Sequence, residues 1–253
     1  MLFLVILNFQ QLVFDTIIHR NSKIGEAPSL HTPIVLYDAA SKGSVNFLNL
    51  AKEFLLKNVD SIEAMAQSAL EAAPEKFALA GFGLGGTVAL EIARRAPGRL
   101  TRLALIDAHY MYETATIAAE RDVQMARVRA GRLRDVMRED ILAHFPQDQQ
   151  PSNEYLEFVL AMATDLGPDY YQNQARALQR RPDQQGTLRR MRGFKTMIMC
   201  GQLNQQTQIK RHEFAANLIE DASIEIIPNS AYIASAEQPR AVNAALMTWM
   251  QQA

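Results

Sequence analysis

The sequence predicts an α/β domain in which a mostly parallel central sheet is flanked by helices. Three observations support this prediction. Short apolar runs bounded by glycine, proline or polar residues recur along the chain, as is typical of buried strands. Amphipathic helical patterns lie between several of these runs, and such alternation favours parallel pairing. A chain of 253 residues is long enough for one domain of this kind with a sizeable core.

Six apolar runs are predicted to be strands, and four amphipathic stretches are predicted to be helices. The predicted strands are 2–7, 33–38, 76–81, 100–107, 194–201 and 223–228. The predicted helices are 61–74, 84–98, 211–221 and 239–252. Proline or glycine ends the first two helices. The single tryptophan, Trp249, lies in the last helix, and we expect it in the core.

Residues 111–181 interrupt the alternation with helical patterns at about 111–130, 132–145, 152–166 and 169–181. We interpret 1–110 and 182–253 as the core and 111–181 as a helical cap or lid. A lid at the carboxyl ends of the strands would cover the edge where α/β proteins form their sites. A helical insertion with solvated outer faces is the alternative interpretation. We expect the arginine-rich part, 121–138, to be such a solvated face.

Composition excludes several function classes. The net charge of -1 implies no general attraction to nucleic acid or to an anionic membrane. The N-terminal apolar run lacks the features of a signal peptide and is too short to span a bilayer, so we expect a buried strand. A single cysteine, Cys200, excludes an intrachain disulfide and fits a reducing, cytoplasmic location. We expect Cys200 to be a core residue.

The histidines and carboxylates show no metal-ligand spacing, so we expect no metal. His19, His31, His144 and His212 have no partner at a spacing typical of a site. We expect each of them at the surface or at a helix cap.

A glycine-rich turn, "GFGLGG" at 81–86, follows a predicted strand and opens a predicted helix. Gly81, Gly83 and Gly86 match the pattern G-x-G-x-x-G, and Asp107 follows Gly86 by 21 residues. This is formally a dinucleotide-binding fingerprint. A dinucleotide unit normally continues with alternating strands and helices, whereas a long helical segment follows here. We therefore expect no cofactor, and keep dinucleotide binding as an alternative.

The segment "FALAGFGLGGTVALEIARRAPGRLTRLALIDA" resembles the α/β-hydrolase fold family, in particular small bacterial esterases and lactonases. The segments "FKTMIMCGQLNQQT" and "IEIIPNSAYIASAEQPRAVNAAL" extend this resemblance. It implies an α/β-hydrolase fold with a helical lid. In that family the sharp turn carries a serine nucleophile, and an acid and a histidine follow along the chain.

All three triad positions implied by the resemblance are substituted. They hold Gly83, Asn204 and Tyr232. Glycine offers no nucleophile, asparagine cannot stabilise an imidazolium, and a tyrosine with a pKa of about 10 is a poor base. We therefore predict that serine-hydrolase activity is absent.

In this interpretation, the site around Gly83, Asn204 and Tyr232 is a polar but uncharged pocket under the lid. The residues expected to line it are Asn8, Phe9, Gln10, Phe82, Gly83, Leu84, His109, Asn204 and Tyr232. The Leu84 N–H is expected to keep its place as an oxyanion donor. Such a pocket would bind a small neutral carbonyl-bearing molecule or assist a non-hydrolytic reaction.

Three alternatives remain at this point. The chain could be a hydrolase or lyase with relocated groups, in which His109 and Asp107 form a base for water. It could be an engineered or inactive esterase-like hydrolase. It could also be an interaction partner of an active homologue. His109 also has a purely structural interpretation, as a loop histidine that is hydrogen-bonded to the backbone.

Overall fold

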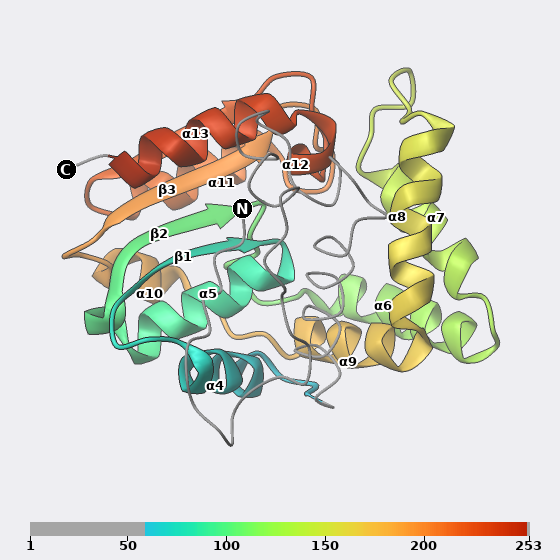
Figure 1. The fold of residues 1–253 in the computed structure, drawn as a ribbon. Helices are drawn as coiled ribbons and strands as arrows, with labels where there is room; N and C mark the ends of the chain where they lie inside the picture. Colours follow the sequence, from blue (N-terminus) through green and yellow to red (C-terminus); the bar gives the residue numbers. More distant parts are fainter. Residues whose placement is uncertain (1–58, 252–253) are drawn as a thin grey trace, which may run out of the picture.

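A computed structural model describes residues 59–251 of the chain (Figure 1). The predicted strands 2–7 and 33–38, the expected lining residues Asn8, Phe9 and Gln10, and His19 and His31 lie outside these residues. The elements, in chain order, are α4 (Ile62–Ala72), β1 (Phe77–Phe82), α5 (Leu84–Arg95), the 3-10 helix η1 (Pro97–Arg99), β2 (Leu100–Ile106), α6 (Ala115–Arg129), α7 (Leu133–Ala143), α8 (Asn153–Leu166), α9 (Pro168–Gln179), α10 (Gln185–Arg190), β3 (Lys195–Gly201), α11 (Ile209–Asn217), β4 (Ala222–Ile227), α12 (Ala234–Glu237) and α13 (Pro239–Gln251).

The four described strands form one parallel sheet in the order β1-β2-β3-β4. This confirms the fold class predicted from the alternating pattern. Neighbouring residues along β2 point to opposite faces of the sheet. Leu103 and Leu105 pack with α4, α5 and α11, whereas Ala104 packs with α13. Figure 1 shows α13 on one side of the sheet and α4 and α5 on the other.

Two predicted core residues lie where the sequence placed them. Trp249 on α13 is 4% exposed and packs against Met197 and Met199 of β3. Cys200 is fully buried near the end of β3, and burial raises the pKa of its thiol to about 12. Cys200 is therefore a protonated core residue and not a nucleophile.

The helices α6, α7, α8 and α9 lie between β2 and β3, in the segment where the sequence predicts helices. They pack on one another through small clusters of their own, separate from the clusters on the sheet. One of these clusters reaches Ala231, in the loop after β4. Within residues 59–251, no helix is both long and apolar enough to cross a membrane.

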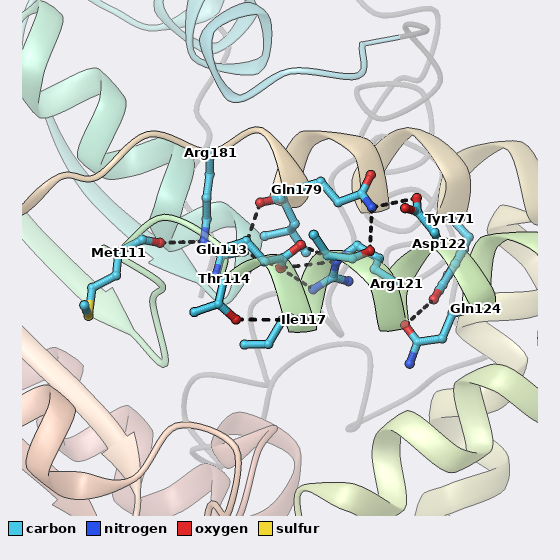
Figure 2. A network of polar contacts seen from close by, with 12 residues as sticks. Met111, Glu113, Thr114, Ile117, Arg121, Asp122, Gln124, Tyr171, Gln179 and Arg181 are labelled. Carbon is cyan, nitrogen blue, oxygen red and sulfur yellow. Dashed lines mark hydrogen bonds and ion pairs between the residues drawn. The ribbon is translucent and has the colours of Figure 1, made fainter.

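A buried ion-pair network joins the two ends of this helical segment (Figure 2). Glu113 lies just before α6, and its side chain is completely buried. Arg121 of α6 and Arg181, just after α9, both donate to Glu113 Oε1 at 2.8 Å. Arg181 Nε also donates to the Met111 carbonyl at 2.7 Å. The chain entering the segment is thus bonded to the chain leaving it.

Electrostatics supports an ionised Glu113. Burial by itself would raise the pKa of Glu113, but hydrogen bonds and charge attraction from Arg121 and Arg181 hold it below the ordinary value. Removing one member of a buried ion pair leaves the other charges uncompensated.

We predict that Glu113→Gln lowers the free energy of unfolding by about 3 kcal/mol, because two arginines lose their shared counter-charge. Chemical denaturation measures this. The matched control is Glu139→Gln, which breaks the exposed pair with Arg127 and should change stability little. Equal effects of the two substitutions would contradict the structural role of Glu113.

The glycines of the turn after β1 permit close packing between the turn and its neighbours. A Cβ on Gly81 would lie 2.4 Å from the Gly85 carbonyl oxygen, and a Cβ on Gly86 would lie 2.5 Å from the Ala108 Cβ. These contacts account for glycine at both positions.

We predict that Gly86→Ala destabilises the fold by about 1–3 kcal/mol, because the added methyl group overpacks this contact. The neighbouring Gly85 is the matched control, because a Cβ there meets nothing within 4 Å. Gly85→Ala should leave stability unchanged or raise it slightly, since alanine favours the helix. Urea denaturation of both variants checks the prediction, and equal losses would contradict it.

Candidate functional site

The carboxyl ends of the described strands bring Gly83, Asn204 and Tyr232, the positions at which the resemblance implies a triad, to one edge of the sheet. Gly83 follows β1, Asp107 follows β2, Asn204 follows β3 and Tyr232 follows β4. The carboxyl edge of a parallel sheet is where α/β proteins place their sites. The three positions therefore lie on neighbouring loops although they are far apart in the sequence.

Gly83 adopts the strained backbone of a sharp strand-to-helix turn, with φ 54° and ψ -117°. Its N–H donates to the Ile106 carbonyl at 2.8 Å, and its carbonyl accepts from the N–H groups of Gly86 and Thr87. An L-residue with a side chain is disfavoured in this conformation. Leu84 is the first residue of α5, so its N–H belongs to the unpaired first turn of the helix.

Tyr232 lies over Gly83. A Cβ at position 83 would be 3.1 Å from the Tyr232 hydroxyl oxygen. The phenol ring contacts Phe82, with ring centroids 5.0 Å apart, and stacks on the imidazole of His144, with centroids 3.8 Å apart and ring planes 9° apart. Burial raises the pKa of Tyr232, so the hydroxyl stays protonated at neutral pH. Within residues 59–251 it has no hydrogen-bond partner.

The carboxylate of Glu237 holds the loop that carries Tyr232. Glu237 Oε2 accepts the N–H of Ala231 at 2.7 Å, and Oε1 accepts the N–H of Tyr232 at 3.0 Å. The Tyr155 hydroxyl of α8 donates to the same carboxylate at 3.4 Å. No local sequence pattern identifies Glu237 or Tyr155, because their pairing joins two distant segments.

Asp107 is fully buried, with a positive φ of 46°. Its Oδ1 accepts from Asn204 Nδ2 at 3.1 Å and from Thr207 Oγ1 at 3.2 Å, and lies 3.6 Å from His212 Nε2. Burial raises the pKa of Asp107 to about 7, although hydrogen bonds from Asn204, Thr207 and the Gly201 N–H oppose this shift. Asp107 therefore links the ends of β2 and β3.

Asn204 is almost completely buried and bonded on both sides of its amide. Its Nδ2 donates to Asp107 and, at 2.7 Å, to Thr207 Oγ1. Its Oδ1 accepts the N–H groups of Gln206 and Thr207 and lies 3.2 Å from Nδ1 of His144. The position at which the resemblance implies an acid is thus occupied by a neutral side chain, which links Asp107, Thr207 and His144.

His109 is placed near this edge, but its ring has no hydrogen bond or ion pair with any residue in the described range. The backbone carbonyl of His109 accepts from Thr87 Oγ1 at 3.0 Å. Burial, with the nearby Arg181 and Arg121, lowers the pKa of its imidazole to about 3. The side chains of His109 and Asp107 are not hydrogen-bonded to each other, and Asp107 faces His212 instead.

Of two other histidines, one contradicts the sequence-based expectation and the other agrees with it. His212 was expected at the surface or a cap, and this is wrong, because it is 3% exposed within α11. His144 is the C-cap residue of α7, which the sequence allowed, but its ring is buried against Tyr232. No spacing along the chain could have found these contacts, because they join elements distant in sequence.

Two cavities lie among the described residues, and Gly83 lines neither of them. One of about 10 Å³ lies beside His212 between the sheet and its helices, and an open groove of about 310 Å³ lies between α5 and α10. The space directly above Gly83 holds the Tyr232 hydroxyl. Within residues 59–251, no His, Cys, Asp and Glu side chains form a group suited to a metal ion.

We predict that the contribution of Asp107 to the free energy of unfolding falls as the pH rises. In the unfolded chain its carboxyl loses its proton near the ordinary pKa of 3.8, whereas the folded state keeps the proton to about 7. Unfolding therefore releases a proton in this window, and the stability contributed by Asp107 falls as pH rises through it.

Relative to Asp107→Asn, the native chain should lose about 3 kcal/mol of unfolding free energy between pH 5 and pH 8. Denaturation curves of both proteins across this range measure the difference. Parallel pH profiles for the two proteins would show that the folded pKa of Asp107 is not raised.

Comparison with protein families finds no family model that matches. Local sequence similarity links the chain to chromosome-partitioning proteins. It is 49% identical over 45 residues to the sporulation initiation inhibitor protein Soj of Bacillus subtilis, and 40% identical over 50 residues to ParA of Myxococcus xanthus. The first match covers 18% of both chains, and the second covers 20% of this chain and 18% of ParA. The chain thus spans less than a fifth of the length of these relatives.

Comparison with solved structures finds esterases and other hydrolases. A thermophilic esterase from Thermogutta terrifontis has a TM-score of 0.70 at 24% identity, covering 76% of this chain and 73% of the esterase. A hydrolase from Pseudomonas aeruginosa has a TM-score of 0.67 at 20% identity, covering 77% and 73%. An enol-lactonase from Burkholderia xenovorans has a TM-score of 0.63 at 15% identity, covering 76% and 74%. At these identities the likeness concerns the fold alone, and this chain has the α/β-hydrolase fold.

Proposed function

We propose that this chain is a non-hydrolytic protein of the α/β-hydrolase fold that binds a small neutral carbonyl-bearing molecule at the Gly83 turn. The helical segment α6–α9 acts in this proposal as the lid of the site. The observation that carries the proposal is the Tyr232 hydroxyl, which has no partner in the described range and lies 3.1 Å from the Cβ position of Gly83.

The loss of hydrolysis follows from the chemistry of the three positions. Acyl transfer by a triad needs a nucleophile, a base that takes its proton, and an acid that stabilises the resulting imidazolium. Gly83 has no side chain, Tyr232 is a protonated phenol, and Asn204 is neutral and fully engaged with its neighbours. A serine side chain at position 83 would also meet the Tyr232 hydroxyl.

The hydrogen-bond donors and the charges around Gly83 indicate the kind of ligand. The Leu84 N–H and the Tyr232 hydroxyl are two hydrogen-bond donors, which suit a carbonyl oxygen. The imidazole of His109 is neutral at neutral pH. The carboxylate of Asp107 is buried behind Asn204 and Thr207. A neutral ligand fits these surroundings better than an ion, because an unpaired ion in a buried site keeps its desolvation penalty.

A relocated base at His109 has less support. Its pKa of about 3 makes the imidazole a weak base. It also lacks the carboxylate partner that would stabilise its protonated form.

The test is turnover of short activated esters by the native chain and by the triple variant Gly83→Ser/Asn204→Asp/Tyr232→His. We expect no turnover above buffer for the native chain. Activity in the triple variant would show that only the triad is missing. Clear turnover by the native chain that His109→Ala abolishes would overturn the proposal in favour of a relocated base.

The control is the single variant Gly83→Ser, which we expect to be less stable than the native chain and inactive. The new side chain would have to adopt a strained φ and would crowd Tyr232. Tyr232→His in the triple variant removes the phenol from that contact.

A further inference from the structure

His144 is a buried imidazole that the resemblance to hydrolases did not identify. It is the C-cap residue of α7, outside the loops that hold Gly83, Asn204 and Tyr232. Its ring is 6% exposed and lies flat on the ring of Tyr232. A second polar ring therefore lies directly beside the phenol over Gly83.

The hydrogen bonds of Asn204 determine which nitrogen of His144 carries the proton. Backbone N–H groups only donate, so the atom that receives the N–H groups of Gln206 and Thr207 must be the amide oxygen Oδ1. The same orientation directs Nδ2 to the acceptor Asp107. Since Oδ1 cannot donate, His144 Nδ1 must donate its proton across the 3.2 Å contact.

The other nitrogen of His144, Nε2, is then an acceptor that receives no hydrogen bond from residues 59–251. Burial lowers the pKa of His144, so the ring is neutral at neutral pH and carries one proton, on Nδ1. Nε2 keeps its lone pair, and no group in residues 59–251 donates a hydrogen bond to it. The hydrogen bonds from Asp107 through Asn204 to His144 thus orient a neutral imidazole whose Nε2 is an acceptor.

We infer that His144 Nε2 is a ligand-binding acceptor, and that the ligand carries an O–H or N–H group next to its carbonyl. This inference rests on the proposed function above. The Tyr232 hydroxyl donates to the carbonyl oxygen, and His144 Nε2 accepts from the neighbouring hydroxyl or amide. Stacking puts the phenol that carries this donor beside the imidazole that carries this acceptor, and we expect one small molecule to use both. The ligand class is neutral 2-hydroxy carbonyl compounds and their N–H analogues.

Matched probe pairs test this inference directly. Each pair differs in one hydroxyl: α-hydroxy-γ-butyrolactone with γ-butyrolactone, methyl lactate with methyl propionate, and lactamide with propionamide. Ligand-observed NMR gives the Kd of each. We expect the native chain to bind the hydroxylated members roughly five- to tenfold more tightly, the effect of one hydrogen bond.

The variant His144→Phe keeps an aromatic ring against Tyr232 but removes Nε2. It should bind the two members of each pair equally, because the acceptor for the hydroxyl is gone. Tyr232→Phe should instead weaken both members by the same factor, because it removes the donor to the carbonyl.

The outcomes separate the inference from the proposed function. If the native chain binds both members of each pair equally, the role of His144 is overturned and carbonyl binding stands. If it binds none of the probes, both are overturned.

A measurement on the native chain covers the case in which His144→Phe does not fold. Nitrogen-15 NMR of the imidazole should show a protonated Nδ1 and an unprotonated Nε2. The opposite tautomer would overturn the inference, because Nε2 would then be a donor.

Discussion

The buried carboxylate of Asp107 is the group on which the arrangement of this edge depends. It cannot remain buried without hydrogen bonds, and it obtains them from Asn204 and Thr207, both in the loop after β3. That requirement fixes the loop after β3 against the end of β2. The orientation of Asn204 follows, and the proton position of His144 follows from Asn204. Asp107 thus helps to determine which nitrogen of His144 carries the proton, although the two side chains are linked only through Asn204.

Packing accounts for the glycines of the turn at Gly83. The close approach of the turn to Gly85 and Ala108 leaves no room for a Cβ at Gly81 or Gly86. The positive φ at Gly83 suits glycine better than any other residue. The fold therefore keeps the strand, turn and helix for structural reasons, whatever chemistry the turn supports. The same turn also leaves the backbone N–H groups in the first turn of α5 available as donors.

The helical segment contributes to the site as well as lying beside it. His144 at the end of α7 stacks on Tyr232, and Tyr155 of α8 bonds the carboxylate that holds the loop of Tyr232. At its other end the segment is closed by Glu113 with its two arginines (Figure 2). A change in how these helices pack would therefore move the phenol over Gly83.

The sequence by itself determined the alternating elements, the parallel sheet and the sharp turn at Gly83, because periodicity and glycine placement act over a few residues. It also singled out Gly83, Asn204 and Tyr232, which the structure places at one edge of the sheet. Only the tertiary structure decided that Asp107 faces His212 instead of His109, that Glu237 holds the loop, and that His144 stacks on Tyr232. These contacts join residues far apart in the chain, and no local pattern records which buried polar groups will satisfy one another.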